Sequence, residues 1–465
     1  MLKTPFKRAA RSEMRKARDG AIIQRIRDFQ TDRPKKWFPT ITHLRSFQYV
    51  ILPLMIWMST FSLPAQHDVN YREELVPVYT LPDPLTFDQG EKVHNTGDWE
   101  QRRQELISRF EEEMFGITPP WKGSVNGSIL SEKMACNGKA VRQEILIELS
   151  LHNKSLKMVL LLYLPKEGTS HPLFLGYNFH GNHTVTAEPD VLITDSWVRN
   201  SDVTYAANNK ADERGRGSFS GRWPVEKIIE KGFGLATLYY GDIDPDFHDG
   251  FRNGAHALYE AGEQASWGSV AAWAWGLSRV MDYLESDPRI DRNKVTVIGH
   301  SRLGKAALWA GAKDERFAMV VSNNSGCGGA AISRRKFGET IRIINTAFPH
   351  WFTEKFTSYN DREEQLPFDQ HQLLALTAPR PLYVASASND LWADPRGEFL
   401  SCVFASPVYA LYGLKGLADV SMPAVNTPVR GEAMAYHIRE GEHNITAADW
   451  EHYLDFAEKV LRKND

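Results

Sequence analysis

Cysteine is scarce in this 465-residue chain, which contains only Cys136, Cys327 and Cys402. Three residues cannot build a disulfide framework, although an exported protein could close one bridge and keep one free thiol. The sequence also lacks a Cys/His cluster with zinc-ligand spacing and a glycine-rich phosphate loop. We therefore expect neither a metal site nor a nucleotide cofactor.

A large excess of charge is also missing, because 55 Lys and Arg residues stand against 58 Asp and Glu residues. Hydrophobic residues make up 42% of the chain and charged residues 24%. This composition is typical of a globular protein with a sizeable core rather than a disordered or fibrous one. Large α/β sheets with insertions often form one domain at this length, so we expect a single large catalytic domain.

Basic residues are concentrated at the N-terminus, where residues 1–46 hold thirteen Lys and Arg but only four acids. An uncharged apolar run, Phe47 to Ala65, follows directly. Together they predict a secretory signal whose cleavage site is imperfect because Leu63 is not small, with Met14 as a candidate downstream start. A membrane anchor formed by 47–65 is one alternative, although the run is shorter than the ~20 residues that span a bilayer comfortably. A buried core helix and a nucleic-acid-binding arm are the others; the apolar run explains the charge better than nucleic acid does.

We therefore predict a secreted or periplasmic protein in three parts: residues 1–65 are the export segment, 66–97 a linker or surface strap, and 98–465 the catalytic domain. The strap is rich in Pro, Asp and Thr and shows no periodicity. Asp98 is the expected N-cap of an amphipathic helix over Trp99 to Phe115, which Gly116 ends.

Beyond this helix, strand and helix patterns alternate. Residues 141–149 and 156–164 predict a β-hairpin. Short apolar runs of buried parallel type follow at 173–179, 234–240, 295–299, 318–322, 382–387 and 433–438. Helical patterns lie at 261–285, 304–313, 397–412 and 447–463. The order predicts an α/β fold with a mostly parallel sheet covered by helices on both faces, and a ligand site at the carboxyl ends of the strands.

Two long insertions interrupt this pattern, and the first of them is polar. Residues 180–231 fit no regular element well, and residues 325–370 are dense in Arg, Phe and Trp. Long loops that follow central strands are often functional. We expect both insertions to roof the active site.

The strongest local signal is Gly299-His300-Ser301, which joins the strand at 295–299 to the helix at 304–313. This strand–turn–helix context is that of a nucleophile elbow, although Leu303 occupies the place of the usual second glycine and Gly304 comes one position later. The sharp turn exposes the serine hydroxyl, and the helix N-terminus favours a developing oxyanion. We therefore predict an α/β-hydrolase fold with long active-site insertions, and Ser301 as its nucleophile.

In this fold the acid and then the histidine follow the serine along the chain. Asp390 comes after the strand at 382–387, and it is preferred to Asp394, which precedes Pro395 and is typical of a turn or helix start. His443 follows the last strand, whereas His437 lies inside it and is expected in the core. Ser301 would attack an ester carbonyl, His443 would move the proton, and Asp390 would hold the imidazole.

Arg302 is the predicted oxyanion residue, through its backbone N–H or its guanidinium, with the segment after Phe179 as a second source of donors. A guanidinium beside the nucleophile suits a polar or anionic acyl group, because it can bind a carbonyl oxygen through fork-like hydrogen bonds.

Several stretches, taken in order, resemble the glucuronoyl esterases of carbohydrate esterase family fifteen, and in particular their bacterial branch. The resemblance covers roughly residues 98–463, and its motifs are 299–307, 322–331, 348–352, 366–371, 378–386 and 442–446. It implies a metal-free serine esterase that cleaves esters between glucuronic acid, with or without a 4-O-methyl group, and lignin alcohols in glucuronoxylan.

Position by position, the resemblance implies that Ser301, Asp390 and His443 form the triad and that Arg302 stabilises the oxyanion. Lys305, Glu339 and Trp392 match the residues that hold the sugar ring and its hydroxyls, and a charged pair with an indole is a reasonable sugar-binding set.

One departure stands out among the matched positions. Many members of the family place the acid in the segment after the strand at 318–322, where this chain has Asn324. An amide cannot carry the negative charge, so Asp390 has to supply it.

Three alternatives remain beside a glucuronate esterase. The same machinery could act on acetylated xylan or another uronate ester. A polysaccharide-binding protein without catalysis and a nucleic-acid binder are the others.

Overall fold

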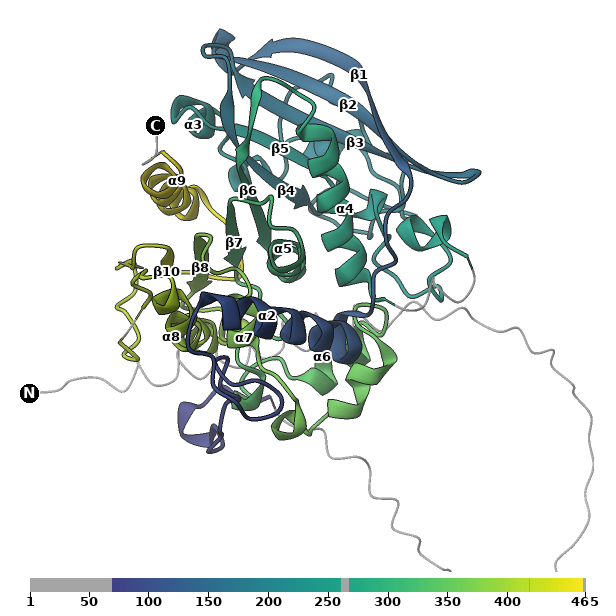
Figure 1. The fold of residues 1–465 in the computed structure, drawn as a ribbon. Helices are drawn as coiled ribbons and strands as arrows, with labels where there is room; N and C mark the ends of the chain where they lie inside the picture. The colour runs from purple at the N-terminus through teal and green to yellow at the C-terminus, as the bar shows by residue number, and fades with distance from the viewer. Residues whose placement is uncertain (1–68, 261–266, 418, 463–465) are drawn as a thin grey trace, which may run out of the picture. The chain divides into compact units, whose positions relative to one another are not determined.

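The computed structural model describes residues 69–260, 267–417 and 419–462. A sheet of ten strands forms the centre of this part of the chain (Figure 1). The strand order is β1-β2-β3-β5-β4-β6-β7-β8-β10-β9. The strands are β1 (Ser124–Ala135), β2 (Ala140–Leu151), β3 (Lys154–Pro165), β4 (His171–Asn178), β5 (Gly234–Tyr239), β6 (Ile290–His300), β7 (Met319–Asn323), β8 (Leu382–Ala387), β9 (Val429–Arg430) and β10 (Met434–Arg439).

The centre of the sheet is parallel and its two ends are antiparallel. Strands β5, β4, β6, β7, β8 and β10 pair in parallel. Strands β1, β2 and β3 pair antiparallel at one end, where β3 also meets β5, and β9 meets β10 at the other. The predicted hairpin is confirmed as β2 and β3, which turn between Leu151 and Lys154. The six predicted buried runs are also confirmed, each within one or two residues except that β6 begins five residues earlier.

Helices cover both faces of the sheet, as Figure 1 shows. They are α2 (Thr96–Phe110), α3 (Val225–Glu230), α4 (Ser269–Leu284), α5 (Arg302–Lys313), α6 (Ile341–Ala347), α7 (Gln370–Ala375), α8 (Pro395–Leu411) and α9 (Ala447–Leu461).

Alternate side chains of the central strands fill two separate cores. On β4, Phe174 packs with Trp450 of α9 and with the α3 side of the sheet. Its neighbours Leu173 and Leu175 join the larger cluster that includes α4, α5 and α8. Because successive strand residues point to opposite faces, a run that is apolar throughout requires a cover on both sides. The mostly parallel sheet with helices on both faces confirms the predicted fold class.

The first helix begins differently from the prediction. Asn95, rather than Asp98, is its N-cap, and the Asn95 side chain accepts a hydrogen bond from the Asp98 N–H at 3.0 Å. Asp98 instead accepts from the His94 N–H at 2.8 Å. The predicted end at Gly116 is confirmed, where φ is 86°, after a single π-helical turn over Glu111–Phe115.

Four other elements were not predicted from the sequence. Strand β1 is mostly exposed, so it shows no apolar alternation, and the short helices α3, α6 and α7 lie inside or beside the two insertions. Helix α4 begins at Ser269, and residues 261–266 of its predicted range lie outside the described residues.

The predicted export segment, residues 1–65, also lies outside the described residues. Within the described ranges, no helix is long and apolar enough to cross a membrane. All three cysteines are free thiols, and Cys327 and Cys402 are buried.

Candidate active site

Ser301 lies between β6 and α5 with φ 58° and ψ −129°, a conformation that residues other than glycine rarely adopt. Its N–H donates to the Asn323 carbonyl of neighbouring strand β7 at 2.9 Å. The tight turn also explains Gly299, because a Cβ there would lie 1.9 Å from the Leu303 carbonyl oxygen. At Gly304 a Cβ would be 3.0 Å from Ser325, so the displaced glycine of the motif lets α5 pack closely on the next strand's loop.

The loops after β8 and β10 bring Asp390 and His443 together. The Nδ1 atom of His443 lies 2.5 Å from Oδ2 of Asp390. Asp390 is 5% exposed, whereas the His443 side chain is 39% exposed. The His443 ring lies 4.6 Å from the ring of His300, the residue that directly precedes Ser301. A carboxylate on Nδ1 can keep the proton there and leave Nε2 free to act as a base.

Asn324 donates a hydrogen bond to the Asp390 carboxylate. Its Nδ2 donates to Oδ2 of Asp390 at 2.8 Å, so the same oxygen faces both the imidazole and the amide. Asn324 has φ 47°, a left-handed conformation that asparagine tolerates well. The Asn324 amide is therefore a hydrogen-bond donor to Asp390, the candidate acid.

The two competing residues have structural roles. Asp394 caps α8 by accepting from the Gly397 N–H at 3.0 Å and pairs with Arg335 at 2.8 Å. His437 is 1% exposed and contacts Asp449 at 2.9 Å, as expected of a core histidine.

The guanidinium of Arg302 lies over Trp351, 4.7 Å from the ring centroid, and forms an ion pair with the buried carboxylate of Asp246. Asp246 also accepts from Tyr240 at 2.9 Å and from His350 at 2.9 Å. Burial alone would raise the pKa of Asp246, but Arg302 and His350 outweigh it and hold the pKa well below its usual range. An ionised Asp246 thus fixes the direction of the Arg302 side chain.

Asp246 was not among the predicted site residues. The available signal was the acidic stretch Asp242-Ile-Asp-Pro-Asp246, which follows the carboxyl end of β5. Trp351 and His350 come from the second insertion, so that insertion borders the site as predicted.

Lys305, one helical turn after Ser301 on α5, forms a buried pair with Glu339. The Nζ atom of Lys305 lies 3.9 Å from Glu339 and donates to the carbonyls of Ser325 at 2.5 Å and Cys327 at 2.6 Å. Their side chains are 4% and 8% exposed. Burial raises the pKa of Glu339 despite Lys305 and lowers the pKa of Lys305 despite Glu339. Trp392 is half-buried beside them, and its carbonyl accepts from the Glu339 N–H at 3.0 Å.

The first insertion contributes Arg222, which donates to Asn444, the neighbour of His443, at 2.7 Å. Its guanidinium lies 4.5 Å from the ring centroid of Phe219, and Phe219 stacks on His180 at 4.7 Å. Burial lowers the pKa of Arg222 to about 10. The segment after Phe179 thus borders the site, as the sequence indicated.

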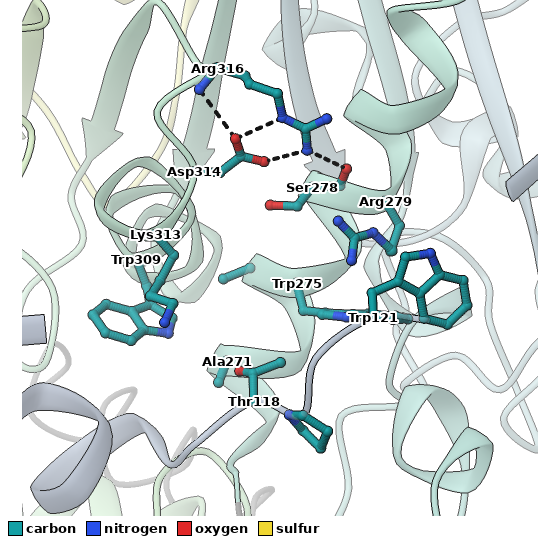
Figure 2. Close-up of a pocket in the computed structure, with 12 residues that line it drawn as sticks. Thr118, Trp121, Ala271, Trp275, Ser278, Arg279, Trp309, Lys313, Asp314 and Arg316 are labelled. Carbon is teal, nitrogen blue, oxygen red and sulfur yellow. Dashed lines mark hydrogen bonds and ion pairs between the residues drawn. The ribbon is translucent and has the colours of Figure 1, made fainter. Parts of the chain in front are cut away.

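No group of three or more His, Cys, Asp or Glu side chains in the described ranges is arranged to hold a metal ion. A cavity of about 340 Å³ does lie outside the site, between α4 and the C-terminal end of α5 (Figure 2). It is lined by tryptophans and by cations such as Arg316, which pairs with Asp314 at 2.7 Å. None of the candidate residues lines it.

An elbow serine, a histidine–carboxylate pair and a fixed arginine on an α/β-hydrolase fold define a carboxylic ester hydrolase of the serine type. A family model described as "Glucuronyl esterase, fungi" matches residues 226–413. Carbohydrate esterase MZ0003, from an unknown prokaryotic organism, is 48% identical over 84% of this chain and 91% of its own length.

Two solved structures agree with this match. One is a promiscuous CE15 esterase from the marine bacterial metagenome, which is 48% identical to this chain. The match covers 84% of this chain and 100% of that protein, with a TM-score of 0.80. A glucuronoyl esterase from Solibacter usitatus is 45% identical with the same coverage, 84% and 100%, and a TM-score of 0.78. This chain belongs to the glucuronoyl esterase family, carbohydrate esterase family 15.

Proposed function

We propose that this esterase hydrolyses esters of glucuronic acid, with or without a 4-O-methyl group, such as those that join glucuronoxylan to lignin alcohols. The observation that carries the proposal is the buried pair of Lys305 and Glu339 beside the nucleophile. In a glucuronate ester the reacting carbonyl is attached directly to the sugar ring, so ring hydroxyls come within reach of this pair. A simple acetyl group would leave both buried polar groups without a ligand.

The proposed reaction begins when Ser301 Oγ attacks the ester carbonyl and His443 Nε2 takes the serine proton. The Asp390 carboxylate stabilises the resulting imidazolium. The tetrahedral intermediate collapses, and the alcohol leaves with the proton from His443. Water then attacks the acyl-enzyme with His443 again as base, which releases glucuronate and regenerates Ser301.

In this proposal Arg302 stabilises the oxyanion. Its attachment to Asp246 and its position over Trp351 support that role, because a preorganised cation pays little to reorient as charge develops. Lys305, Glu339 and Trp392 hold the sugar. No metal takes part in these steps.

Hydrolysis of benzyl glucuronate by purified wild-type protein and by Ser301→Ala tests the reaction and the nucleophile together. Activity that disappears in the variant would support both. Turnover of acetyl esters without turnover of benzyl glucuronate would keep the nucleophile and overturn the substrate.

A second candidate is an esterase for acetylated xylan or other carbohydrate esters, because one relative of this chain is described as promiscuous. The two candidates differ in the ratio of kcat/KM for methyl glucuronate to that for an acetylated sugar.

The same proposal assigns residues 98–465 to the catalytic domain, 66–97 to a surface strap and 1–65 to an export segment, so that the enzyme acts outside the cytoplasm. A cleaved signal is preferred to an anchor through residues 47–65. N-terminal sequencing of the native protein distinguishes them, because cleavage would remove the run and an anchor would retain it.

A further inference from the structure

The proposed reaction does not use residues 69–82, the first described part of the strap, although this part lies against the proposed sugar-binding residues. The carbonyl of Asn70 accepts from the Gly338 N–H at 2.8 Å. Three residues later, Glu73 pairs with Arg335 at 2.5 Å. These two contacts hold the start of the strap along residues 335–339, the loop that ends at Glu339.

This loop is in turn attached to the loop that carries Trp392. A Cβ added at Gly338 would lie 2.4 Å from the Trp392 carbonyl oxygen, so the two backbones are in close contact there. Arg335 pairs with Asp394 as well as with Glu73, and Asp394 caps the helix that follows Trp392. Strap, Glu339 loop and Trp392 loop therefore form one hydrogen-bonded unit.

Between these two attachment points the strap presents Tyr71. Its ring meets Phe337 edge to face, with 6.3 Å between the ring centroids, and the residue remains 38% exposed. In the described part of the chain, its hydroxyl has no hydrogen-bond partner. Burial raises the pKa of Tyr71, and the carboxylates of Asp390 and Glu339 raise it further. The charges of these two carboxylates therefore act on the phenol, and the hydrogen bond from Gly338 to Asn70 places Tyr71 next to the loop that ends at Glu339.

We infer that Tyr71 is a specificity-determining residue that contacts the sugar part of the ester. With Glu339 and Trp392 it forms one side of the subsite, where its hydroxyl and ring edge meet a pyranose hydroxyl and the adjoining sugar face. It lies with the proposed sugar residues, so it contacts the acid side of the ester rather than the departing alcohol. This inference rests on the proposed function.

The test compares the full-length wild-type chain with Tyr71→Ala, Tyr71→Phe and Val78→Ala. Val78 is a matched control on the same strap, because its side chain is fully exposed. The substrates are benzyl glucuronate, methyl glucuronate and 4-nitrophenyl acetate. Tyr71→Ala should lower kcat/KM about tenfold on both glucuronate esters, mainly through KM, which is the range expected for one hydrogen bond with its packing. Tyr71→Phe should lie between, and the acetate rate should stay within about twofold.

A second measurement does not depend on turnover. In Ser301→Ala, addition of Tyr71→Ala should weaken the binding of D-glucuronate, measured by calorimetry, by the same factor as the rise in KM. Equal losses on glucuronate and acetate esters, or unchanged glucuronate kinetics, would overturn the inference alone. A wild-type enzyme that hydrolyses acetate but neither glucuronate ester would overturn the proposed function, and the inference with it.

Discussion

Replacement of Asp390 by asparagine tests the acid of the proposed triad. The amide has nearly the shape of the carboxylate, but its NH₂ group can donate to Nδ1 of His443, which lies 2.5 Å from the present oxygen, once the Asn324 amide turns its oxygen toward it. The ring proton would then move to Nε2, and His443 could no longer accept the serine proton. We expect kcat to fall by about 10⁴, which corresponds to about 5 kcal/mol in the barrier.

A second substitution, at Asn324, can restore a negative charge close to His443. Asn324 lies 2.8 Å from the same Asp390 oxygen, so Asn324→Asp in the Asp390→Asn background places a carboxylate where many family members have their acid. We expect kcat to recover by at least about tenfold over the single variant, since a charged acceptor again favours the imidazolium.

The assay is kcat on benzyl glucuronate and on 4-nitrophenyl acetate, with thermal unfolding as a check of folding. Both esters should lose the same factor, because the acid acts on His443 and not on the sugar. Asn324→Ala in the same background is the control, and it should recover nothing. If Asp390→Asn keeps more than about a tenth of the wild-type kcat, the reasoning about the tautomer is wrong.

Three further predictions concern single side chains. Glu339→Ala should lower kcat/KM for glucuronate esters about tenfold or more while it spares an acetate ester, and equal losses would contradict a sugar-binding role. Asp246→Asn should lower kcat on both esters, because Arg302 loses the ion pair that directs it; wild-type kcat on both esters would show that the pair is unimportant for catalysis. Glu398 is buried in α8, and burial raises its pKa from 4.5 to about 8. The folded state therefore binds this proton more tightly than the unfolded state, so its contribution to stability is complete below pH 4.5 and is lost as the pH rises toward 8. Denaturant titrations should show this slope, at most about 1.4 kcal/mol per pH unit, in the wild type and not in Glu398→Gln.

Much of the fold follows from local patterns. The buried strands were predictable because a parallel strand covered on both faces is mostly apolar, as are β4 and β5, in which every residue is buried. The N-cap of α2 was less predictable, because Asn95 and Asp98 both have side chains suited to capping. Strand β1 could not be predicted, since long-range pairing with β2, rather than burial of its own side chains, holds it in the sheet.

Part of the candidate site could also be predicted from the sequence. Ser301, Asp390 and His443 each follow a predicted strand, and parallel strands bring their carboxyl ends to one edge of the sheet, so the sequence could indicate these residues and their order. Lys305 could be indicated as well, because it lies one helical turn after Ser301.

The amino-acid sequence by itself determined the alternation of strands and helices, the elbow at Ser301 and the candidate residues that follow β8 and β10. Only the tertiary structure decided that Asn324 donates to Asp390, that Asp246 holds Arg302 and that Gly338 donates to Asn70, beside Tyr71. These pairs join residues 56 to 268 positions apart in the chain. Hydrogen bonds and ion pairs act over a few ångströms in space, and no local pattern records which distant segments folding will bring that close.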